Sequence, residues 1–255
     1  MHHKIALVTG STSGIGRGIA ERFASLGARV AVHGPDEAEA CRVAAQLVEK
    51  GLPAIAVAGD LADVEACRSV VRSTIDHYGG IDVLVNNAAS TARAYLEDAP
   101  VEFWDRMMHV NLRAPFLCMQ EAVKSMKTRG GGSILNIGSV NAYVGDPKLG
   151  PYSVSKGGLM TLTRNAAASF NRYRIRVNQL NIGWTLTEGE ERVKREEEHD
   201  PDWFPKAVAT RPFGRLLLPQ DIALAAEYFA SDASALVTGT VMDLEQFPVG
   251  APGTW

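Results

Sequence analysis

Short apolar runs alternate along the chain with longer segments in which apolar residues recur every three or four positions. The short runs are hydrophobic throughout, as in strands that are buried on both faces of a parallel sheet. The longer segments have the period of amphipathic helices. The pattern predicts strands at residues 4–10, 28–34, 53–60, 81–88, 133–139, 174–183 and 235–244. It predicts helices at residues 14–27, 36–51, 62–79, 101–126 and 219–232, and a further helix that opens at Tyr152.

This alternation predicts an α/β fold, a doubly wound parallel sheet of about seven strands with helices on both faces. No internal repeat and no Pro/Ser-rich linker divides the sequence, so we expect residues 1–255 to form a single Rossmann-like domain. Such sheets bind ligands beyond the carboxyl ends of their strands. The residues that follow each strand are therefore the first candidates for a functional site.

The composition is that of a globular protein with a large core, since 46% of the 255 residues are hydrophobic and 22% are charged. A net charge of -3 gives no reason to expect a nucleic-acid partner. No apolar run is long enough to span a membrane, and the start MHHKIALVTGS lacks the features of a signal peptide. We therefore expect a cytoplasmic protein without a membrane partner, whose His2 and His3 are either native or left by cloning.

Cysteine and histidine usage predicts no metal site. Cys41, Cys67 and Cys118 are isolated and odd in number, which indicates reduced, buried thiols. The six histidines show no paired ligand spacing.

A glycine-rich loop follows the first predicted strand and leads directly into a helix. Glycines let backbone N–H groups approach a pyrophosphate, and the helix N-terminus adds a partial positive charge. The spacing is GxxxGxG within a βαβ unit, which favours a dinucleotide site over a glycine-rich turn without a ligand. The candidate binding residues are Gly10, Ser11, Thr12, Ser13, Gly14, Ile15 and Gly16.

The second strand ends at His33-Gly34-Pro35-Asp36, where the adenosine ribose of a dinucleotide would lie. A carboxylate at this place selects NAD, whereas an arginine selects the extra phosphate of NADP. Gly34 and Pro35 occupy the place, Asp36 lies just beyond, and no arginine lies within residues 10–16 or 33–37. We therefore expect NAD, while NADP stays possible through Arg17, His33 or Arg42.

Three further strand ends carry polar residues. Asp60 could accept a hydrogen bond from the adenine amino group, or cap the next helix in competition with Asp63. The stretch Asn86-Asn87-Ala88-Ala89 places an asparagine that can bond the backbone of a loop beside alanines that let a cofactor come close. Ser139 ends the fifth strand, and its hydroxyl could bond a substrate carbonyl.

Asn111 lies in a long helical pattern, four residues before Pro115. Proline lacks the N–H that would bond the carbonyl of residue 111. If the helix continues through, that carbonyl needs another partner, and an ordered water that passes protons toward Lys156 would serve. The alternative is a simple kink.

The stretch YSVSK places Tyr152 and Lys156 on one face of the predicted helix. An ammonium group beside a phenol favours the phenolate, so we expect Lys156 to lower the pKa of Tyr152. Tyr152 would then serve as an acid or base near neutral pH. The pair alone is also compatible with two ordinary residues of an amphipathic helix.

Taken in order and spacing, TGSTSGIG, Asp60-Leu61, NNAA, Asn111, Ser139 and YSVSK resemble the short-chain dehydrogenase/reductase family. The resemblance covers essentially the whole chain, including PQDIALAAEYFASDASALVTG near its end. It implies a nicotinamide cofactor, hydride transfer between an alcohol and a ketone or aldehyde, and a homotetramer. Tyr152 would be the acid/base, Lys156 would lower its pKa and bind the nicotinamide ribose, Ser139 would orient the substrate oxygen, and Asn111 would hold a relay water. The remaining cofactor contacts that the resemblance implies are Leu61, Asn87, Ala88, Gly183, Thr185 and Thr187.

The sequence departs from the usual pattern of the family at three places. Ala89 replaces the glycine of NNAG, Ile182-Gly183 replaces proline-glycine, and residues 244–247 (LEQF) replace VDGG. The last segment lies near the tetramer interface in relatives, so the interface or the site would differ. The Tyr-x3-Lys spacing fits carbonyl reductases better than enoyl reductases.

The substrate would lie under a lid formed by residues 187–218, whose many charges we interpret as a solvated helix face. Aromatic faces and hydroxyl- or carboxylate-binding groups favour a small sugar, polyol or hydroxy acid, oxidised to a ketone or from lactol to lactone. The main alternative is a 3-oxoacyl-thioester reductase, and an alternative of another class is a dinucleotide-binding sensor without turnover. The candidate substrate residues are Arg93, Asn141, Tyr143, Trp184 and Trp203, with Phe204 and Arg211 as further candidates.

Overall fold

The computed structural model describes residues 1–143, 146–197 and 201–249, and within them the chain forms a seven-stranded sheet in the order β3-β2-β1-β4-β5-β6-β7. Each neighbouring pair of strands is parallel. The predicted doubly wound sheet is therefore confirmed. The strands are β1 (Ile5–Val8), β2 (Arg29–Gly34), β3 (Ala54–Ala58), β4 (Val83–Asn86), β5 (Gly132–Ser139), β6 (Ile175–Ile182) and β7 (Val241–Leu244).

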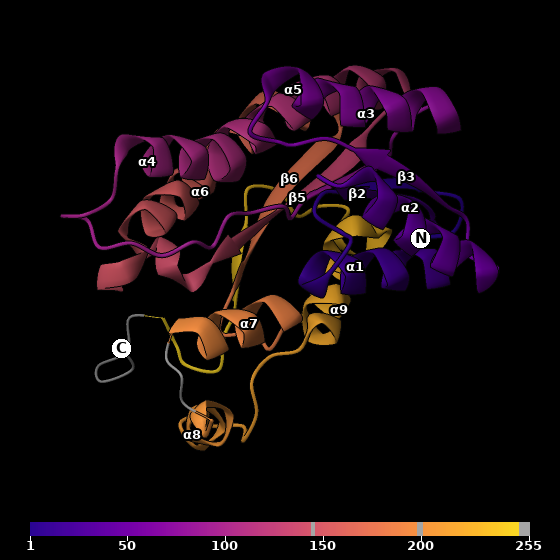
Figure 1. Cartoon of the computed structure of the whole chain (residues 1–255). Helices are drawn as coiled ribbons and strands as arrows, with labels where there is room; N and C mark the ends of the chain where they lie inside the picture. The colour runs from indigo at the N-terminus through magenta and orange to yellow at the C-terminus, as the bar shows by residue number, and fades with distance from the viewer. Residues whose placement is uncertain (144–145, 198–200, 250–255) are drawn as a thin grey trace.

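Helices cover both faces of the sheet (Figure 1). Alternate strand residues point to opposite faces, so Val8 belongs to one buried cluster with α1, α2 and α9, and Leu7 to another with α3, α5 and α6. Two further helices, α7 and α8, lie beyond one end of the sheet (Figure 1). The helices are α1 (Gly14–Ser25), α2 (Glu37–Glu49), α3 (Val64–Tyr78), α4 (Val101–Met108), α5 (Ala114–Thr128), α6 (Gly150–Phe170), α7 (Glu188–Glu197), α8 (Trp203–Ala209) and α9 (Pro219–Ala230).

Three expectations from the sequence need correction. The long helix predicted at residues 101–126 is divided into α4 and α5 by a π-helical turn, His109–Arg113. The last strand begins at Val241 rather than at residue 235, because a 3-10 turn, Asp232–Ser234, and a left-handed Gly239 (φ 74) come before it. Cys67 and Cys118 are buried thiols as expected, but Cys41 is exposed on α2.

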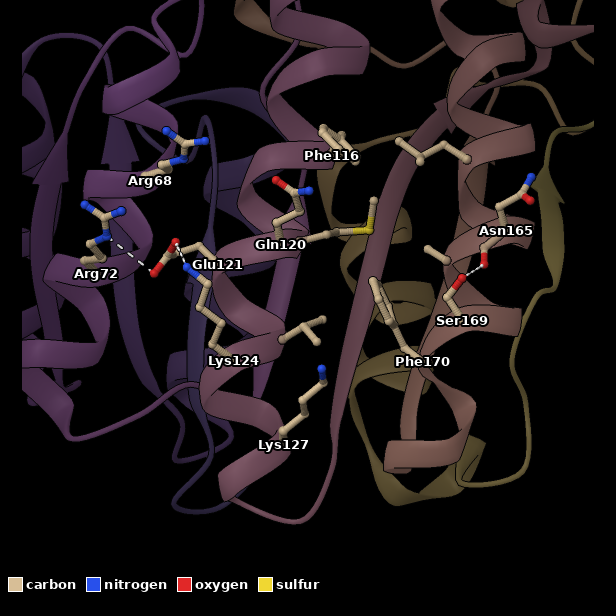
Figure 2. Close-up of a pocket in the computed structure, with 14 residues that line it drawn as sticks. Arg68, Arg72, Phe116, Gln120, Glu121, Lys124, Lys127, Asn165, Ser169 and Phe170 are labelled. Carbon is tan, nitrogen blue, oxygen red and sulfur yellow. Dashed lines mark hydrogen bonds and ion pairs between the residues drawn. The ribbon is translucent and has the colours of Figure 1, made fainter.

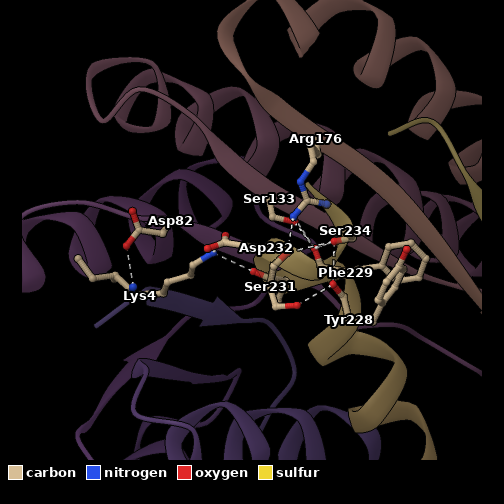
Figure 3. Close-up of polar contacts among 11 residues, drawn as sticks. Lys4, Asp82, Ser133, Arg176, Tyr228, Phe229, Ser231, Asp232 and Ser234 are labelled. Atoms are coloured by element: carbon tan, nitrogen blue, oxygen red, sulfur yellow. Dashed lines mark hydrogen bonds and ion pairs between the residues drawn. The ribbon is translucent and has the colours of Figure 1, made fainter. Parts of the chain in front are cut away.

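Polar contacts fix the end of α9 to the sheet (Figure 3). Arg176 of β6 donates to the carbonyls of Phe229 at 2.8 Å and Ser231 at 3.2 Å. The hydroxyl of Ser133 on β5 donates to the same Phe229 carbonyl at 2.7 Å. The last carbonyls of α9 thus find their partners on two neighbouring strands.

No helix in the part of the chain that the structure describes is both long and apolar enough to cross a membrane.

Candidate active site

A cleft of about 490 Å³ follows the carboxyl ends of the parallel strands. One end is lined by residues after β2 and β3, the middle by the loop after β1, and the other end by residues of β5, β6 and α6. The predicted site residues that line it are Gly10, Ser13, Gly14, Ile15, Gly16, His33, Asp60, Leu61, Asn87, Ala88, Tyr152, Lys156 and Thr187. The expectation that strand ends form the site is thereby realised at one edge of the sheet.

The glycine loop leaves no room for side chains at its turn. A Cβ atom on Gly16 would lie 2.2 Å from the carbonyl oxygen of Gly10 and 2.4 Å from Nδ2 of Asn87. Gly10 and Gly14 have φ values of 63° and 52°, which favour glycine. Asn87 donates from Nδ2 to the carbonyls of Thr9 and Gly10, both at 2.9 Å, so the prediction that an asparagine holds this loop is confirmed.

Two predicted cofactor contacts in this loop are turned inward. The Ser11 hydroxyl is fully buried, donates to the carbonyl of Val8 at 2.7 Å and accepts from the backbone N–H of His33 at 2.9 Å. Thr12 packs against Gly34, where an added Cβ would lie 2.6 Å from the threonine methyl group. These side chains shape the loop, and the approach to the cleft is left to the glycines and to Ser13.

His33 joins three strand ends. Its Nδ1 atom lies 2.9 Å from the N–H of Gly10, and its Nε2 atom lies 3.0 Å from the carbonyl oxygen of Gly59. Burial lowers the pKa of this imidazole to about 4, so the ring is neutral at physiological pH.

The two aspartates at the end of the cleft where adenine is expected have separate functions. Asp63 caps α3 by accepting from the N–H of Ala66 at 2.7 Å, which answers the question of which aspartate is the cap. Asp60 lines the cleft, accepts from the N–H of Ala62 at 2.9 Å, and pairs with Arg106 at 3.2 Å. The hydrogen bond from the Ala62 N–H lowers the pKa of Asp60, with a further contribution from Arg106.

Around the expected ribose position, the charged groups have partners of their own. Asp36 caps α2 by accepting from the N–H of Glu39 at 2.8 Å. Arg17 pairs with Glu21 at 3.0 Å, and Arg42 pairs with Glu39 at 3.5 Å.

Tyr152, Lys156 and Ser139 meet at the other end of the cleft. Tyr152 and Lys156 come from adjacent turns of α6, Ser139 ends β5, and all three are buried. The ammonium Nζ of Lys156 lies 5.6 Å from the centre of the Tyr152 ring and donates to the carbonyl of Ile137 at 2.8 Å. Burial lowers the pKa of Lys156 to about 8.

The expected lowering of the Tyr152 pKa is wrong for this structure. Burial raises the pKa of the phenol, and the negative charge of Glu190 raises it further, while a hydrogen bond with Ser139 acts in the opposite direction. Desolvation therefore outweighs the neighbouring polar groups. Lys156 is itself desolvated and directs its ammonium to a backbone carbonyl.

Asn111 occupies the π-helical turn that Pro115 accompanies. The N–H of Ala114 donates to the carbonyl of His109, so the chain accommodates the proline by widening one turn. The Asn111 side chain is buried, accepts from the N–H of Ser90 at 2.8 Å and donates to the Ser155 hydroxyl at 3.1 Å. It thus connects the loop after β4 with the first turns of α6, which carry Tyr152.

An aromatic cluster connects the turn after β6 with the predicted lid. The ring centres of Trp184 and Trp203 are 6.4 Å apart, and those of Trp203 and Phe204 are 5.6 Å apart. Lys194 and Arg211 lie over the Trp184 ring, at 5.1 Å and 5.5 Å from its centre. Trp203, a candidate substrate residue, thus contacts the other two aromatic candidates, Trp184 and Phe204.

Glu190 links this cluster to the loop after β4. Its carboxylate accepts from the indole Nε1 of Trp184 at 2.9 Å, and both of its oxygens lie 3.4 Å from Nη2 of Arg93. The side chains of Arg93 and Glu190 are each 19% exposed. The backbone N–H of Glu190 donates to the Thr187 hydroxyl at 3.1 Å, so Thr187 caps the turn that presents this carboxylate.

Comparisons with known proteins agree with this arrangement. A family model described as enoyl-(acyl carrier protein) reductase matches residues 10–245. An uncharacterized oxidoreductase of Thermotoga maritima is 40% identical over 238 residues, which span 93% of this chain and 92% of the relative. The chain belongs to the short-chain dehydrogenase/reductase family. It is accordingly an oxidoreductase that acts on CH–OH groups.

Two solved structures of dehydrogenases are close in shape. A gluconate 5-dehydrogenase from Burkholderia cenocepacia J2315, in complex with NADP and tartrate, has a TM-score of 0.88 at 31% identity, with 96% of this chain and 95% of that chain covered. A 7α-hydroxysteroid dehydrogenase, in complex with NADH and 7-oxo glycochenodeoxycholic acid, has a TM-score of 0.90 at 30% identity, with 98% and 96% covered.

The C-terminal departure from the usual short-chain dehydrogenase/reductase pattern contacts residues at the end of β6 and between α8 and α9. Leu244 accepts from the N–H of Gly183 at 2.9 Å. Gln246 accepts from the N–H of Phe213 at 3.1 Å and donates to the carbonyl of Arg215 at 2.6 Å. The ring of Phe247 lies 4.8 Å from the guanidinium of Arg211. Residues 244–247 thus brace the chain that returns from α8 to α9.

Three other predicted residues make contacts within the protein. The Tyr143 hydroxyl donates to Asp243 on β7 at 3.1 Å. Asn141 donates its backbone N–H to the Ser139 hydroxyl at 3.2 Å. The Thr185 hydroxyl donates to the carbonyl of Gly183 at 3.0 Å, whereas Thr187 lines the cleft.

Glu190 and Ser155 are the residues that sequence reasoning missed in this short-chain dehydrogenase/reductase site. Glu190 was included in a charged stretch interpreted as solvated. The spacing Thr187-x-x-Glu190 is typical of a helix start, and could have singled this glutamate out. Nothing in the local sequence indicates that Ser155 would connect Asn111 with the backbone of Tyr152.

Proposed function

We propose that the chain is an NAD-dependent dehydrogenase that interconverts a secondary alcohol and a ketone, or a lactol and a lactone, on a small sugar, polyol or hydroxy acid. The observation that carries the proposal is the meeting of Tyr152, Lys156 and Ser139 at one end of a cleft whose middle is a glycine loop. This is an acid/base group beside a hydrogen-bonding hydroxyl, with room alongside for an extended dinucleotide.

The residues of the cleft fit such a cofactor. Gly10, Gly14 and Gly16 line the cleft without side chains that would fill it, and α1 begins at Gly14 with its N–H groups toward the loop. When bound, a nicotinamide dinucleotide accepts or supplies the hydride. Asp60 and Leu61 would contact its adenine, and Lys156 its nicotinamide ribose.

The chain itself supplies the proton. Tyr152 would take the alcohol proton at its phenolic oxygen during oxidation and return it during reduction, while the Ser139 hydroxyl holds the substrate oxygen. Asn111 would hold the water that passes the proton onward. The buried, low-dielectric surroundings of these groups strengthen each interaction.

A Tyr152→Phe substitution tests this assignment. It removes one hydroxyl, so kcat should fall by about 10²–10⁴-fold with the cofactor dissociation constant nearly unchanged. Tyr228→Phe on α9 is the matched control, since this tyrosine lies on the outer surface at 40% exposure. If Tyr152→Phe turns over substrate at the wild-type rate, the assignment of Tyr152 as the acid/base is wrong.

The preference for NAD is supported by the charges around the ribose position. Arg17 and Arg42 pair with glutamates, and Pro35 lines the cleft beside His33. Titrating NADH and NADPH side by side, by cofactor fluorescence, should show tighter binding of NADH. A strong preference for NADPH would overturn the assignment.

The substrate class is supported by the groups gathered around Glu190. The indoles of Trp184 and Trp203 offer faces on which sugar rings pack, and Arg93 offers a cation for an acid group. The resemblance to a gluconate 5-dehydrogenase points the same way. A screen of polyols, aldonic acids and 3-oxoacyl thioesters decides the question, because activity on thioesters alone would favour the acyl reductase alternative.

We also propose that residues 1–255 form one domain whose residues 187–218 close over the substrate. The bridge between Thr185 and Leu217 brings the two ends of this segment together. Limited proteolysis should cut within residues 187–218 first, and substrate with cofactor should protect it.

A homotetramer is the assembly that we propose. A groove of about 740 Å³ is lined by residues of α3, α5 and α6, and it carries apolar side chains (Phe116, Met119, Leu162 and Phe170) among charged ones such as Lys124 and Lys127 (Figure 2). Phe116 is 42% exposed, which is unusual for a phenylalanine. Phe116→Glu should shift the mass measured by light scattering to a smaller species, and an unchanged monomeric mass in both proteins would contradict the proposal.

A further inference from the structure

Three elements converge on the carboxylate of Glu190. Arg93 comes from the loop after β4, Trp184 from the turn after β6, and Glu190 itself from the first turn of α7. The indole N–H and the guanidinium thus place donors around one carboxylate-sized position. The position is close enough to the reacting phenol for the charge of Glu190 to act on Tyr152.

The pair of Arg93 and Glu190 has the geometry of an exchangeable contact. Its separation of 3.4 Å exceeds the roughly 2.7–2.9 Å of a strong charge-assisted hydrogen bond. Both side chains keep some solvent exposure, and Glu190 lies on a helix joined to the sheet by a short segment. Lys194 and Arg211 over the Trp184 ring add positive charge to the same neighbourhood.

We propose that Glu190 is an internal stand-in for the carboxylate of a hydroxy-acid substrate, held by Arg93 and Trp184 until that substrate displaces it. This inference rests on the proposed function and narrows its substrate class to acids. Displacement exchanges the Glu190 carboxylate for that of the substrate at the Arg93 guanidinium and the Trp184 indole N–H, and it moves α7, so binding of the acid is coupled to the position of this helix. A neutral polyol has no charge with which to compete and leaves the contact in place.

Substitution of Glu190 distinguishes a carboxylate that competes with the substrate from one that binds the substrate. The test is calorimetric titration of gluconate or glucitol into the full chain with saturating NADH. Neither alcohol reacts with this reduced cofactor, so only binding is measured. In Glu190→Gln, the dissociation constant of gluconate should fall about tenfold, because its competitor is weakened, and that of glucitol should stay the same. Glu191→Gln, which removes the same charge from a residue that lies 3.9 Å from Arg195, should change neither. Arg93→Gln should weaken gluconate in both backgrounds.

Two outcomes would overturn the proposal. If Glu190→Gln weakens the binding of gluconate, then Glu190 itself binds the substrate. If Glu190→Gln and Glu191→Gln change gluconate binding equally, the effect comes from the total charge of α7 and not from the contact of Glu190 with Arg93. Fluorescence of Trp184, identified by comparison with Trp184→Phe, gives a readout that needs no turnover, since gluconate should alter its emission as Glu190 leaves. If gluconate alters the Trp184 emission but the protein oxidises no acid or polyol, the proposed reaction is wrong and the displacement of Glu190 stands. If the protein oxidises acids but gluconate leaves the emission unchanged, the displacement of Glu190 is wrong and the proposed reaction stands.

Discussion

The N–H of Gly10 donates to Nδ1 of His33 at 2.9 Å, and this contact helps to tie the glycine-rich loop after β1 to the end of β2. Because Nδ1 accepts, the ring proton lies on Nε2, which donates to the carbonyl of Gly59 at 3.0 Å. A doubly protonated imidazole could not accept from Gly10. Protonation of His33 would therefore break this contact, while the hydrogen bonds of Ser11 with the His33 backbone and of the Gly59 N–H with the Gly34 carbonyl would remain.

Folding stability should depend on pH through His33. The pKa is 6.5 in the unfolded chain and about 4 in the folded one, so the unfolded chain binds more protons between these values. The contribution is complete above pH 6.5 and is lost as the pH falls toward 4, by about 3 kcal/mol in total. Denaturant unfolding at several pH values measures this slope. His33→Gln should flatten this slope. An equal slope in both proteins would show that His33 does not contribute to the pH dependence of stability.

The rate of alcohol oxidation should depend on the charge of Glu190. Oxidation needs the phenolate of Tyr152, whose charged neighbours are Lys156 on α6 and Glu190 on α7, with Ser139 of β5 as a hydrogen-bond partner. Since the carboxylate raises the pKa of Tyr152, Glu190→Gln should move the midpoint of the pH–rate profile for kcat/KM to lower pH. Glu191→Gln should leave the midpoint where it is. A shift to higher pH would mean that Glu190 does not act on the phenol through its charge.

The free energy of unfolding should depend strongly on Arg176, which holds the end of α9, and weakly on the nearby surface ion pair of Lys4 and Asp232 (Figure 3). Arg176 donates to two carbonyls at the helix end, and Arg176→Met removes both of these charge-assisted hydrogen bonds, which destabilises by about 1–3 kcal/mol. The carbonyls keep their hydrogen bonds from Ser133 and Ser234. Asp232 pairs with Lys4 at 2.7 Å, but its side chain is 91% exposed, so Asp232→Asn should change the free energy of unfolding by less than about 1 kcal/mol. Chemical denaturation of the two variants ranks them. A larger effect from Asp232→Asn would contradict this account.

The sequence predicted the cleft because the required information is local. In a parallel sheet the residues after each strand lie at the same edge, so Gly10, His33, Asp60 and Asn87 could be assigned to one site from strand order alone. The four-residue spacing of Tyr152 and Lys156 likewise places them on adjacent turns of α6 without knowledge of the fold.

What could not be predicted depends on tertiary contacts. The pKa of Tyr152 follows from burial and from Glu190, neither of which the stretch YSVSK contains. Proline at position 115 signalled a break in the helix, but several conformations accommodate a proline, and the choice of a π-helical turn was not determined locally. Tyr143 bonds Asp243 on the last strand, at a sequence distance that no local pattern spans.

The tightest contact in the cofactor loop gives the sharpest test of its architecture. A methyl group on Gly16 would meet the carbonyl of Gly10 at 2.2 Å, and because this neighbour is backbone, the loop itself must move. Gly16→Ala should therefore lower the free energy of unfolding by about 1–3 kcal/mol and raise the cofactor dissociation constant. Gly157→Ala, next to Lys156 in α6, is the control, because its Cβ would come no closer than 3.5 Å to a carbonyl oxygen, and a helical alanine stabilises by up to about 1 kcal/mol. Thermal unfolding and NADH fluorescence measured on both variants compare the two glycines. If Gly16→Ala binds NADH as well as Gly157→Ala does, the loop is not what holds the dinucleotide.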